Sequence, residues 1–144
     1  MAFTTERELV ATILKSDYLK DLTNKGPSVV KEEVEGLFGI PDIAVITTES
    51  EDITNTCAYE AKLKNWKRAL FQAFRYKAFV KVSYVIMDHD HINPALSNME
   101  KFRNSNVGLL SIDNDGEIFS HYIPFEERPY SPRLESRFND IMFQ

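Results

Sequence analysis

Three charged residues stand where two neighbouring strands would bring them together. Asp42 follows Gly39-Ile40-Pro41 at the head of an apolar run, and Glu60 and Lys62 lie two residues apart in a later run. Successive side chains of a strand point to opposite faces, so Glu60 and Lys62 share one face. If the two strands pair, two carboxylates and one ammonium group meet at one point.

That arrangement suits a divalent cation. Carboxylates at close range repel each other, and Mg²⁺ relieves the repulsion by taking one or two carboxylates together with waters and phosphate oxygens. Bound Mg²⁺ activates a water and neutralises charge that grows in a transition state, and Lys62 would orient or deprotonate that water. The residues therefore predict metal-assisted phosphodiester hydrolysis. The structural alternatives are a turn acid at Asp42 and a cross-strand surface pair at Glu60 and Lys62.

Hydrophobic patterns predict the elements that must position these residues. Thr4 or Thr5 would cap a helix over 6–16, and Asn65 would cap a second helix. The polar and acidic stretch at 48–56 is typical of a turn region. The predicted strands cover 29–35, 40–47, 57–63, 82–87, 107–112 and 117–123, and the predicted helices cover 6–16, 65–81, 95–103 and 134–142. The order α-β-β-β-α-β followed by α-β-β-α predicts an α/β domain with a central mixed β-sheet flanked by helices.

Composition limits the classes of protein to consider. The 144 residues suit a single domain over 1–144, with a core at about 5–123 and a Pro-rich tail with a short helix at 124–144. One cysteine, Cys57, excludes an internal disulfide framework. No run approaches the roughly 20 apolar residues that cross a bilayer. We therefore expect a cytoplasmic protein with no membrane partner and with Cys57 buried.

The net charge of −5 would argue against a nucleic-acid partner, but its distribution does not. Residues 62–81 contain seven basic residues and no acid, whereas the other 124 residues contain 10 basic and 22 acidic ones. On the predicted helix after Asn65, the polar face gathers Arg68, Gln72 and Arg75, with Lys64 just before it. The structural alternative is a solvated basic helix face.

Three motifs resemble those of the PD-(D/E)xK nuclease superfamily. They are Gly39-Ile40-Pro41-Asp42, then Glu60-Ala61-Lys62, then Gln72 and Tyr76, which match the QxxxY motif of the RecB-type branch. The predicted order of elements over residues 5–87 is also similar to the core order of that superfamily. The resemblance therefore covers a little more than half of the chain and implies a restriction-endonuclease-like core.

The resemblance implies a role for each matching residue. Asp42, Glu60 and the backbone carbonyl of Ala61 would bind Mg²⁺ or Mn²⁺, and Lys62 would be the catalytic lysine. Gln72 and Tyr76 would contact substrate from the helix. A further acid completes the site in many members, and the choice stays open among these glutamates: Glu6 in the first helix, and Glu32, Glu33 and Glu35 before Asp42.

The resemblance further implies a function. We expect a Mg²⁺- or Mn²⁺-dependent deoxyribonuclease that leaves a 5′-phosphate, with Lys64, Arg68 and Arg75 binding DNA. A homo-oligomer or a protein partner would supply specificity. The alternative is a catalytically silent nuclease-like subunit that binds nucleic acid. The context, whether repair, recombination, phage or defence, stays open.

Two further patterns are interpreted as structural rather than functional. Trp66, Phe71, Phe74 and Phe79 are predicted to be core residues rather than base-stacking ones. Asp88-His89-Asp90-His91 is metal-like in composition, but it lacks zinc-site partners and is predicted to be a solvated loop.

Overall fold

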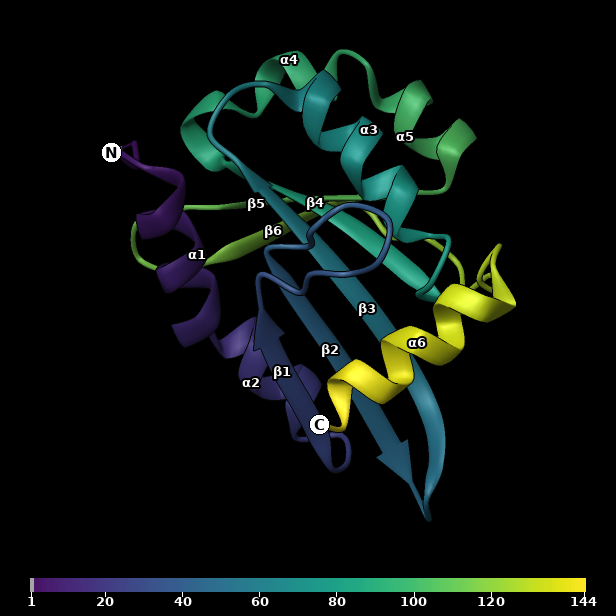
Figure 1. Ribbon diagram of the computed structural model, residues 1–144. Helices are drawn as coiled ribbons and strands as arrows, with labels where there is room; N and C mark the ends of the chain where they lie inside the picture. Colours follow the sequence, from purple (N-terminus) through teal and green to yellow (C-terminus); the bar gives the residue numbers. More distant parts are fainter. Residues whose placement is uncertain (1) are drawn as a thin grey trace.

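The structure, a computed structural model, describes residues 2–144 (Figure 1). Within these residues the helices are α1 (Glu6–Lys15), α2 (Asp17–Thr23), α3 (Trp66–Tyr76), α4 (Asn93–Leu96), α5 (Met99–Ser105) and α6 (Pro132–Met142), with a 3₁₀ turn at His89–His91. The strands are β1 (Ser28–Glu32), β2 (Ile43–Glu49), β3 (Asp52–Lys62), β4 (Val82–Asp88), β5 (Gly108–Ile112) and β6 (Ile118–Tyr122). No helix in this part of the chain is both long and apolar enough to cross a membrane.

The six strands form one sheet in the order of the sequence. β2 is antiparallel to both β1 and β3. β3, β4 and β5 run parallel to one another, and β6 returns antiparallel to β5. Each parallel connection contains helices, α3 between β3 and β4 and α4 with α5 between β4 and β5, as crossover connections require. The predicted α/β class with a mixed sheet flanked by helices is confirmed, and it is compatible with a restriction-endonuclease-like core.

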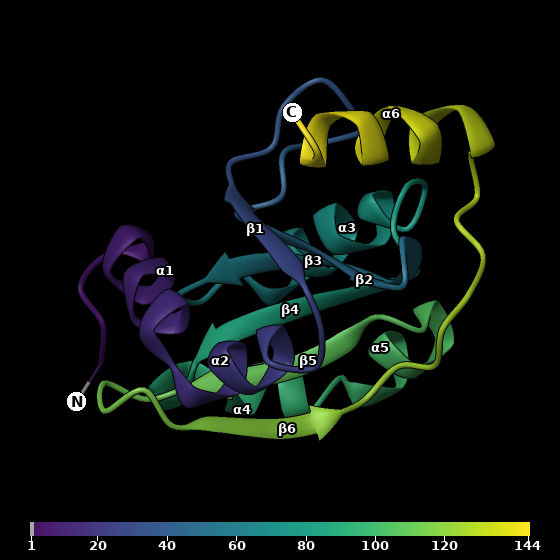
Figure 2. The same ribbon diagram turned by 90° about the horizontal axis from the view of Figure 1, so that it is seen from below.

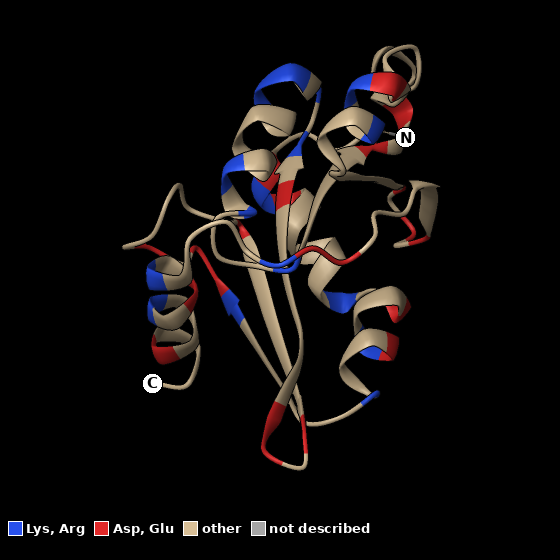
Figure 3. Ribbon diagram, turned by 90° about the vertical axis from the view of Figure 1, so that its right-hand side faces the viewer, with Lys and Arg blue, Asp and Glu red and all other residues tan. Residues whose placement is uncertain are grey.

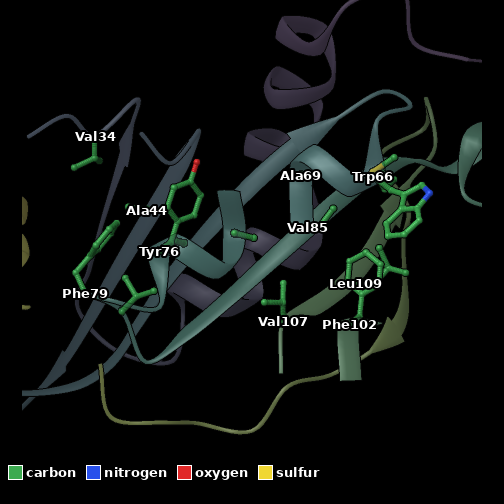
Figure 4. Close-up of a cluster of buried hydrophobic side chains, with 14 of the residues drawn as sticks. Val34, Ala44, Trp66, Ala69, Tyr76, Phe79, Val85, Phe102, Val107 and Leu109 are labelled. Carbon is green, nitrogen blue, oxygen red and sulfur yellow. The ribbon is translucent and has the colours of Figure 1, made fainter. Parts of the chain in front are cut away.

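Helices cover both faces of the sheet (Figures 1 and 2). On one face, Leu9 and Ile13 of α1 pack in a cluster with Ile43, Val45 and Tyr59. On the other face, α3, α5 and α6 pack in a second cluster, part of which is drawn in Figure 4; its members include Ala44, Ala58, Trp66, Ala69, Ala73, Phe79, Val85, Phe102 and Phe138. The alternation of residues 43, 44 and 45 between the clusters follows from the two-residue period of a strand. β2 and β3 are thus buried on both sides near the proposed site.

The long β2–β3 hairpin differs from the prediction of a turn over 48–56. The strands continue to Glu49 and restart at Asp52, so that only Ser50 and Glu51 form the turn. Both turn residues have positive φ angles, 50° and 72°, which suit a tight hairpin although neither is glycine. The hairpin tip carries acidic residues and lies at the end of the molecule opposite α3 (Figures 1 and 3).

The helices also differ from their predicted bounds. Thr5 caps α1, but the helix ends at Lys15, and Ser16 caps the unpredicted helix α2. Asn65 caps α3 as predicted, yet α3 ends at Tyr76 rather than at 81. The helix predicted over 95–103 is two helices, α4 and α5. The Asn98 side chain between them donates to the Pro94 carbonyl at 2.8 Å, which is a side-chain bond that competes with helix continuation.

The tail after β6 is attached to the segment that follows α3. The backbone N–H groups of Glu127 and Tyr130 donate to the carbonyls of Lys81 and Lys77, each at 3.1 Å. Lys77 is 2% exposed, donates to the Ser105 carbonyl at 2.8 Å and forms an ion pair with Glu127. The tail then enters α6, so an ion pair between the buried Lys77 and the part-exposed Glu127 joins the tail to the segment after α3.

Candidate active site

Asp42 lies directly before β2 and contacts the end of β3. Its backbone N–H donates to the Tyr59 carbonyl at 3.1 Å, and its carboxylate Oδ2 accepts from the Ala61 backbone N–H at 2.8 Å. The N–H and C=O of one strand residue point to the same side of the strand, so the Ala61 carbonyl faces the Asp42 side of β3. β2 and β3 therefore bring Asp42 and Ala61 together, as the sequence predicts.

Glu60 is buried under the polar face of α3. It is 4% exposed, and its Oε1 accepts a short hydrogen bond from the Tyr76 hydroxyl. The Ile40 carbonyl lies 2.9 Å from the same hydroxyl, so the two acceptors share its one proton. The Gln72 amide satisfies both of its ends when its nitrogen faces Glu60. It then donates to Oε2 at 2.6 Å, while its oxygen accepts from Arg68 Nη2 at 3.3 Å. Both Glu60 oxygens are thus bonded from α3.

Figure 4 shows how the Tyr76 ring lies beside Ala44 with its hydroxyl oxygen pointing out of the apolar cluster. The ring is fully buried and belongs to that cluster. Packing therefore fixes the ring, and the hydroxyl is held at Glu60. The predicted helix-borne pair Gln72 and Tyr76 contacts the carboxylate itself.

The two carboxylates have raised pKa values. Burial raises the pKa of Glu60 to about 7, and the charge of Asp42 adds to the rise, while the Tyr76 hydrogen bond and Lys62 oppose it. Burial also raises the pKa of Asp42, against the hydrogen bond from Ala61 and the charge of Lys62. Each carboxylate is thus costly to ionise without a nearby cation.

Lys62 and Glu6 meet at the end of β3. Lys62 Nζ lies 3.6 Å from Glu6 Oε1, and Glu6 Oε2 accepts from the Leu63 backbone N–H at 3.4 Å. The negative charge of Glu6 raises the pKa values of both Asp42 and Glu60, whereas the charge of Glu33 acts on Asp42. Glu6, one of the glutamates left open by the sequence, therefore acts on both carboxylates and also pairs with Lys62.

An acidic cleft of about 840 Å³ opens between α1 and the start of β2. Its lining includes Glu6, Arg7, Glu32, Glu33 and Asp42. Glu35 is exposed and is not among the lining residues. The cleft exposes Asp42 to solvent, whereas Glu60 is not among its lining residues. Arg7 is a cleft residue that the sequence motifs do not mark.

The loop before Asp42 fits closely against α3. Gly39 has φ of +84°, and a Cβ atom there would lie 2.9 Å from Tyr76 Cε1. Glycine is needed for both reasons, because other residues rarely adopt that φ and the Tyr76 ring leaves no room for a side chain. The loop thereby holds the Ile40 carbonyl at the Tyr76 hydroxyl.

The donor set fits a hard divalent cation that keeps several waters. Asp42, Glu60 and the Ala61 carbonyl supply oxygen donors, and Mg²⁺ needs only one or two carboxylates from the protein. Across residues 2–144 no cluster of three or more His, Cys, Asp and Glu side chains is arranged to hold a metal ion. A cation at Asp42 and Glu60 would therefore take its remaining ligands from backbone, water and substrate.

Two other predictions are wrong. Phe79 is buried as predicted, but Phe71 and Phe74 are 63% and 41% exposed, because they lie on the outer side of α3. Asp88 is 0% exposed rather than in a solvated loop; its Oδ2 accepts from the Phe3 backbone N–H at 3.0 Å and lies 3.2 Å from His91 Nδ1. Asp88 thus anchors the N-terminal segment. Cys57 is buried, as predicted.

The basic residues predicted to bind substrate surround this centre. Arg68 bonds Gln72, Arg75 lies beside the 39–40 loop, and Lys64 is exposed just before α3. Comparisons with family models, curated proteins and solved structures find no significant match to this chain.

Proposed function

We propose that the chain is a Mg²⁺- or Mn²⁺-dependent nuclease that hydrolyses DNA phosphodiester bonds. The observation that carries the proposal is the convergence of Asp42 and Glu60, two carboxylates with raised pKa values, beside Lys62 and a basic helix. The motifs that contain Asp42, Glu60 and Lys62 resemble those of the PD-(D/E)xK superfamily, and this resemblance supports the nuclease proposal. When bound, the cation supplies Lewis acidity and an activated water.

The chain's own residues then have distinct tasks. Asp42, Glu60 and the Ala61 carbonyl hold the cation, with Glu6 as the additional acid. Tyr76 and Gln72 fix the orientation of the Glu60 carboxylate through the two hydrogen bonds described above. Lys62 exchanges its contact with Glu6 for the substrate phosphate or the attacking water, and its positive charge offsets charge that grows on the phosphate. Lys64, Arg68 and Arg75 bind the DNA backbone.

The test is a cleavage assay on linear duplex, single-stranded and branched DNA, with Mg²⁺, Mn²⁺ or chelator. The native chain should cut in the presence of metal only. Asp42→Asn and Lys62→Ala should lower the rate by about 100-fold or more, because each removes charge stabilisation at the reacting phosphate. Glu126→Ala, an exposed change in the tail, serves as the matched control. Equal cleavage by the native chain and both site variants would contradict the proposal.

The second candidate is a catalytically silent subunit that binds nucleic acid. Both Glu60 oxygens already accept hydrogen bonds, and Lys62 already pairs with Glu6, so the polar groups satisfy one another without a cation. Calorimetric titration with Mn²⁺ separates the candidates. A site that disappears in Asp42→Asn supports the nuclease, and no such site supports the silent subunit.

The setting of the activity is also a proposal. We place the enzyme in the cytoplasm, in repair, recombination, phage or defence processes. We also propose that a second copy of the chain or a protein partner supplies specificity.

A further inference from the structure

Exposed apolar side chains gather beside the candidate active site. Phe38, Phe71 and Phe74 are 46%, 63% and 41% exposed, and Ile40 is 49% exposed. Phe71 and Phe74 project from α3, and Phe38 and Ile40 project from the loop that ends at Asp42. Leaving several large apolar side chains in water on adjoining segments is typical of a binding surface.

Arg75 joins the two segments. Its guanidinium carbon lies 4.2 Å from the Phe38 ring centroid and 5.8 Å from that of Phe71. Its Nε is buried and has no hydrogen-bond partner within residues 2–144. Arg75 thus forms a platform with two aromatic rings and keeps an unused donor.

A shallow groove of about 380 Å³ continues this surface along α3. It is lined by apolar side chains and two lysines, and Lys67 and Lys101 Nζ lie 5.8 Å and 6.0 Å from the Trp66 ring centroid. The lining residues are Trp66, Lys67, Leu70, Phe71, Phe74, Lys101 and Ser105. Phe71 belongs both to the groove and to the Arg75 platform, so the two form one continuous surface, here called the aromatic–basic strip.

The strip adjoins the carboxylates. Arg75 precedes Tyr76, whose hydroxyl bonds Glu60, and Phe38 lies two residues before Ile40, whose carbonyl accepts from the same hydroxyl. A polymer that lies along the strip would therefore present its backbone to the Asp42 and Glu60 site.

We propose that the aromatic–basic strip binds single-stranded DNA next to the scissile phosphate. Aromatic faces stack on unpaired bases, and cations hold the backbone, whereas the base faces of an intact duplex are hidden except at its ends. The absence of acids from residues 62–81 favours a polyanion over an ordinary protein surface. This inference rests on the proposed function for its substrate class, and it adds that the preferred substrate has an unpaired segment.

The test measures binding in chelator, without cleavage, by fluorescence anisotropy of labelled 15-nucleotide probes. The probes are a single strand, a blunt duplex of the same sequence, and a strand in which every base is replaced by an abasic sugar. The single strand should bind at least about 10-fold more tightly than either of the others, because stacking of each base contributes roughly a 10-fold gain, about 1.4 kcal/mol.

Variants localise the effect. Phe38→Ala and Phe71→Ala should each weaken single-strand binding about 10-fold and leave binding of the abasic strand unchanged. Phe143→Ala removes a comparably exposed ring, 52%, at the C-terminus and should change neither. Thermal melting checks that the variants fold, and the probe comparison needs no variant at all.

The outcomes separate this inference from the nuclease proposal. Equal affinity for the normal and abasic strands, or no loss in both strip variants, would overturn the inference. No binding of any probe would also overturn it and would favour a protein partner on the strip. If the chain binds as expected but never cleaves DNA with metal, the nuclease proposal fails and the strip inference stands.

Discussion

The Tyr76 hydroxyl contacts both the Glu60 carboxylate and the loop before Asp42. Tyr76→Phe keeps the packed ring and removes both bonds. The pKa of Glu60 should then rise further, because the Tyr76 hydrogen bond lowers it. We predict a 10- to 100-fold weaker Mn²⁺ affinity, about the cost of losing an outer-sphere partner.

The measurement is Mn²⁺ titration calorimetry at several pH values. The pH at which affinity is half lost should move upward in Tyr76→Phe, which a general loss of stability would not cause. Tyr130→Phe, at a tyrosine that is 54% exposed, is the control and should leave the affinity unchanged. An unaltered pH profile in Tyr76→Phe would contradict the positioning role.

Glu60 makes the metal-free protein sensitive to pH. Its folded-state pKa of about 7 lies above the ordinary value of 4.5, so the folded state binds the proton more tightly. The associated stability is present in full below pH 4.5 and is lost as pH rises to 7. The free energy of unfolding should fall by up to about 3 kcal/mol over this window.

Urea unfolding at pH 5 and pH 8 measures the effect. The side chain in Glu60→Gln cannot ionise. The free energy of unfolding of this variant should therefore change much less between pH 5 and pH 8 than that of the native chain. Saturating Mn²⁺ should restore stability to the native chain at pH 8, because a ligand of the folded state alone stabilises it. A fall of the same size in Glu60→Gln would show that another group is responsible.

Among the structural elements, the loop from β1 to β2 is the least tolerant of change near the site. Gly39→Ala should lower the free energy of unfolding by about 1–2 kcal/mol because of the positive φ, and the close contact with Tyr76 Cε1 should lower it further. It should also weaken Mn²⁺ binding, because displacement of Tyr76 moves the donor of Glu60.

Gly116→Ala is a matched control. Gly116 has a similar φ of +86°, but a Cβ atom there would come no closer than 3.8 Å to Thr12 Cγ2. We expect this variant to carry the backbone cost alone and to bind Mn²⁺ as the native chain does. Equal unfolding free energies and equal affinities in the two variants would contradict the role of the Gly39 contact.

The sequence predicts the elements well where burial is high and poorly where it is not. The β2–β3 core around Ile43 and Tyr59 carries apolar residues that mark it as strand, whereas Asp52–Asn55 extends beyond the helical layers and shows no apolar pattern. Its turn, Ser50-Glu51, lacks the Asn-Gly or Asp-Gly signal of a hairpin. A polar segment of this kind forms a strand because its backbone pairs with the neighbouring strand. Residue types alone do not reveal that pairing.

The candidate site is likewise predicted from the sequence only in part. The shared face of Glu60 and Lys62 and the Asn65 cap follow from local periodicity, so the sequence predicts them. The bond from Tyr76 to Glu60, the cleft position of Arg7 and the exposure of Phe71 depend on how α1 and α3 lie on the sheet. Such tertiary geometry has no local signal.

At the scale of the whole molecule, the tail is held by an ion pair between Glu127 and the buried Lys77. Glu127→Ala should destabilise the protein by about 3 kcal/mol, because it leaves the buried Lys77 charge with only the Ser105 carbonyl and the Phe74 and Tyr130 rings. Lys77→Met should cost less. It leaves Glu127, whose side chain is 32% exposed, with water and a bond from Asn106.

Urea unfolding of the two variants measures this asymmetry, with Glu126→Ala as the exposed neighbouring control. A larger loss in Lys77→Met than in Glu127→Ala would mean that packing of the lysine stem, rather than its charge, governs the contact.

Acidic and basic residues gather at opposite ends of the molecule. The net −5 combines an acidic hairpin tip at one end with a basic α3 beside the carboxylates at the other (Figure 3). Local fields rather than net charge govern the approach of a polyanion. An acidic chain is therefore compatible with a DNA substrate at the α3 end.

In the proposed mechanism, Asp42 and Glu60 share a divalent cation. The most direct measurement is an anomalous difference map from crystals soaked in Mn²⁺ at pH 8, above the pKa of Glu60, with Asp42→Asn crystals treated alike. We predict a peak that contacts both carboxylates in the native protein and is absent from the variant. A native map with no peak at Asp42 and Glu60 would contradict the claim.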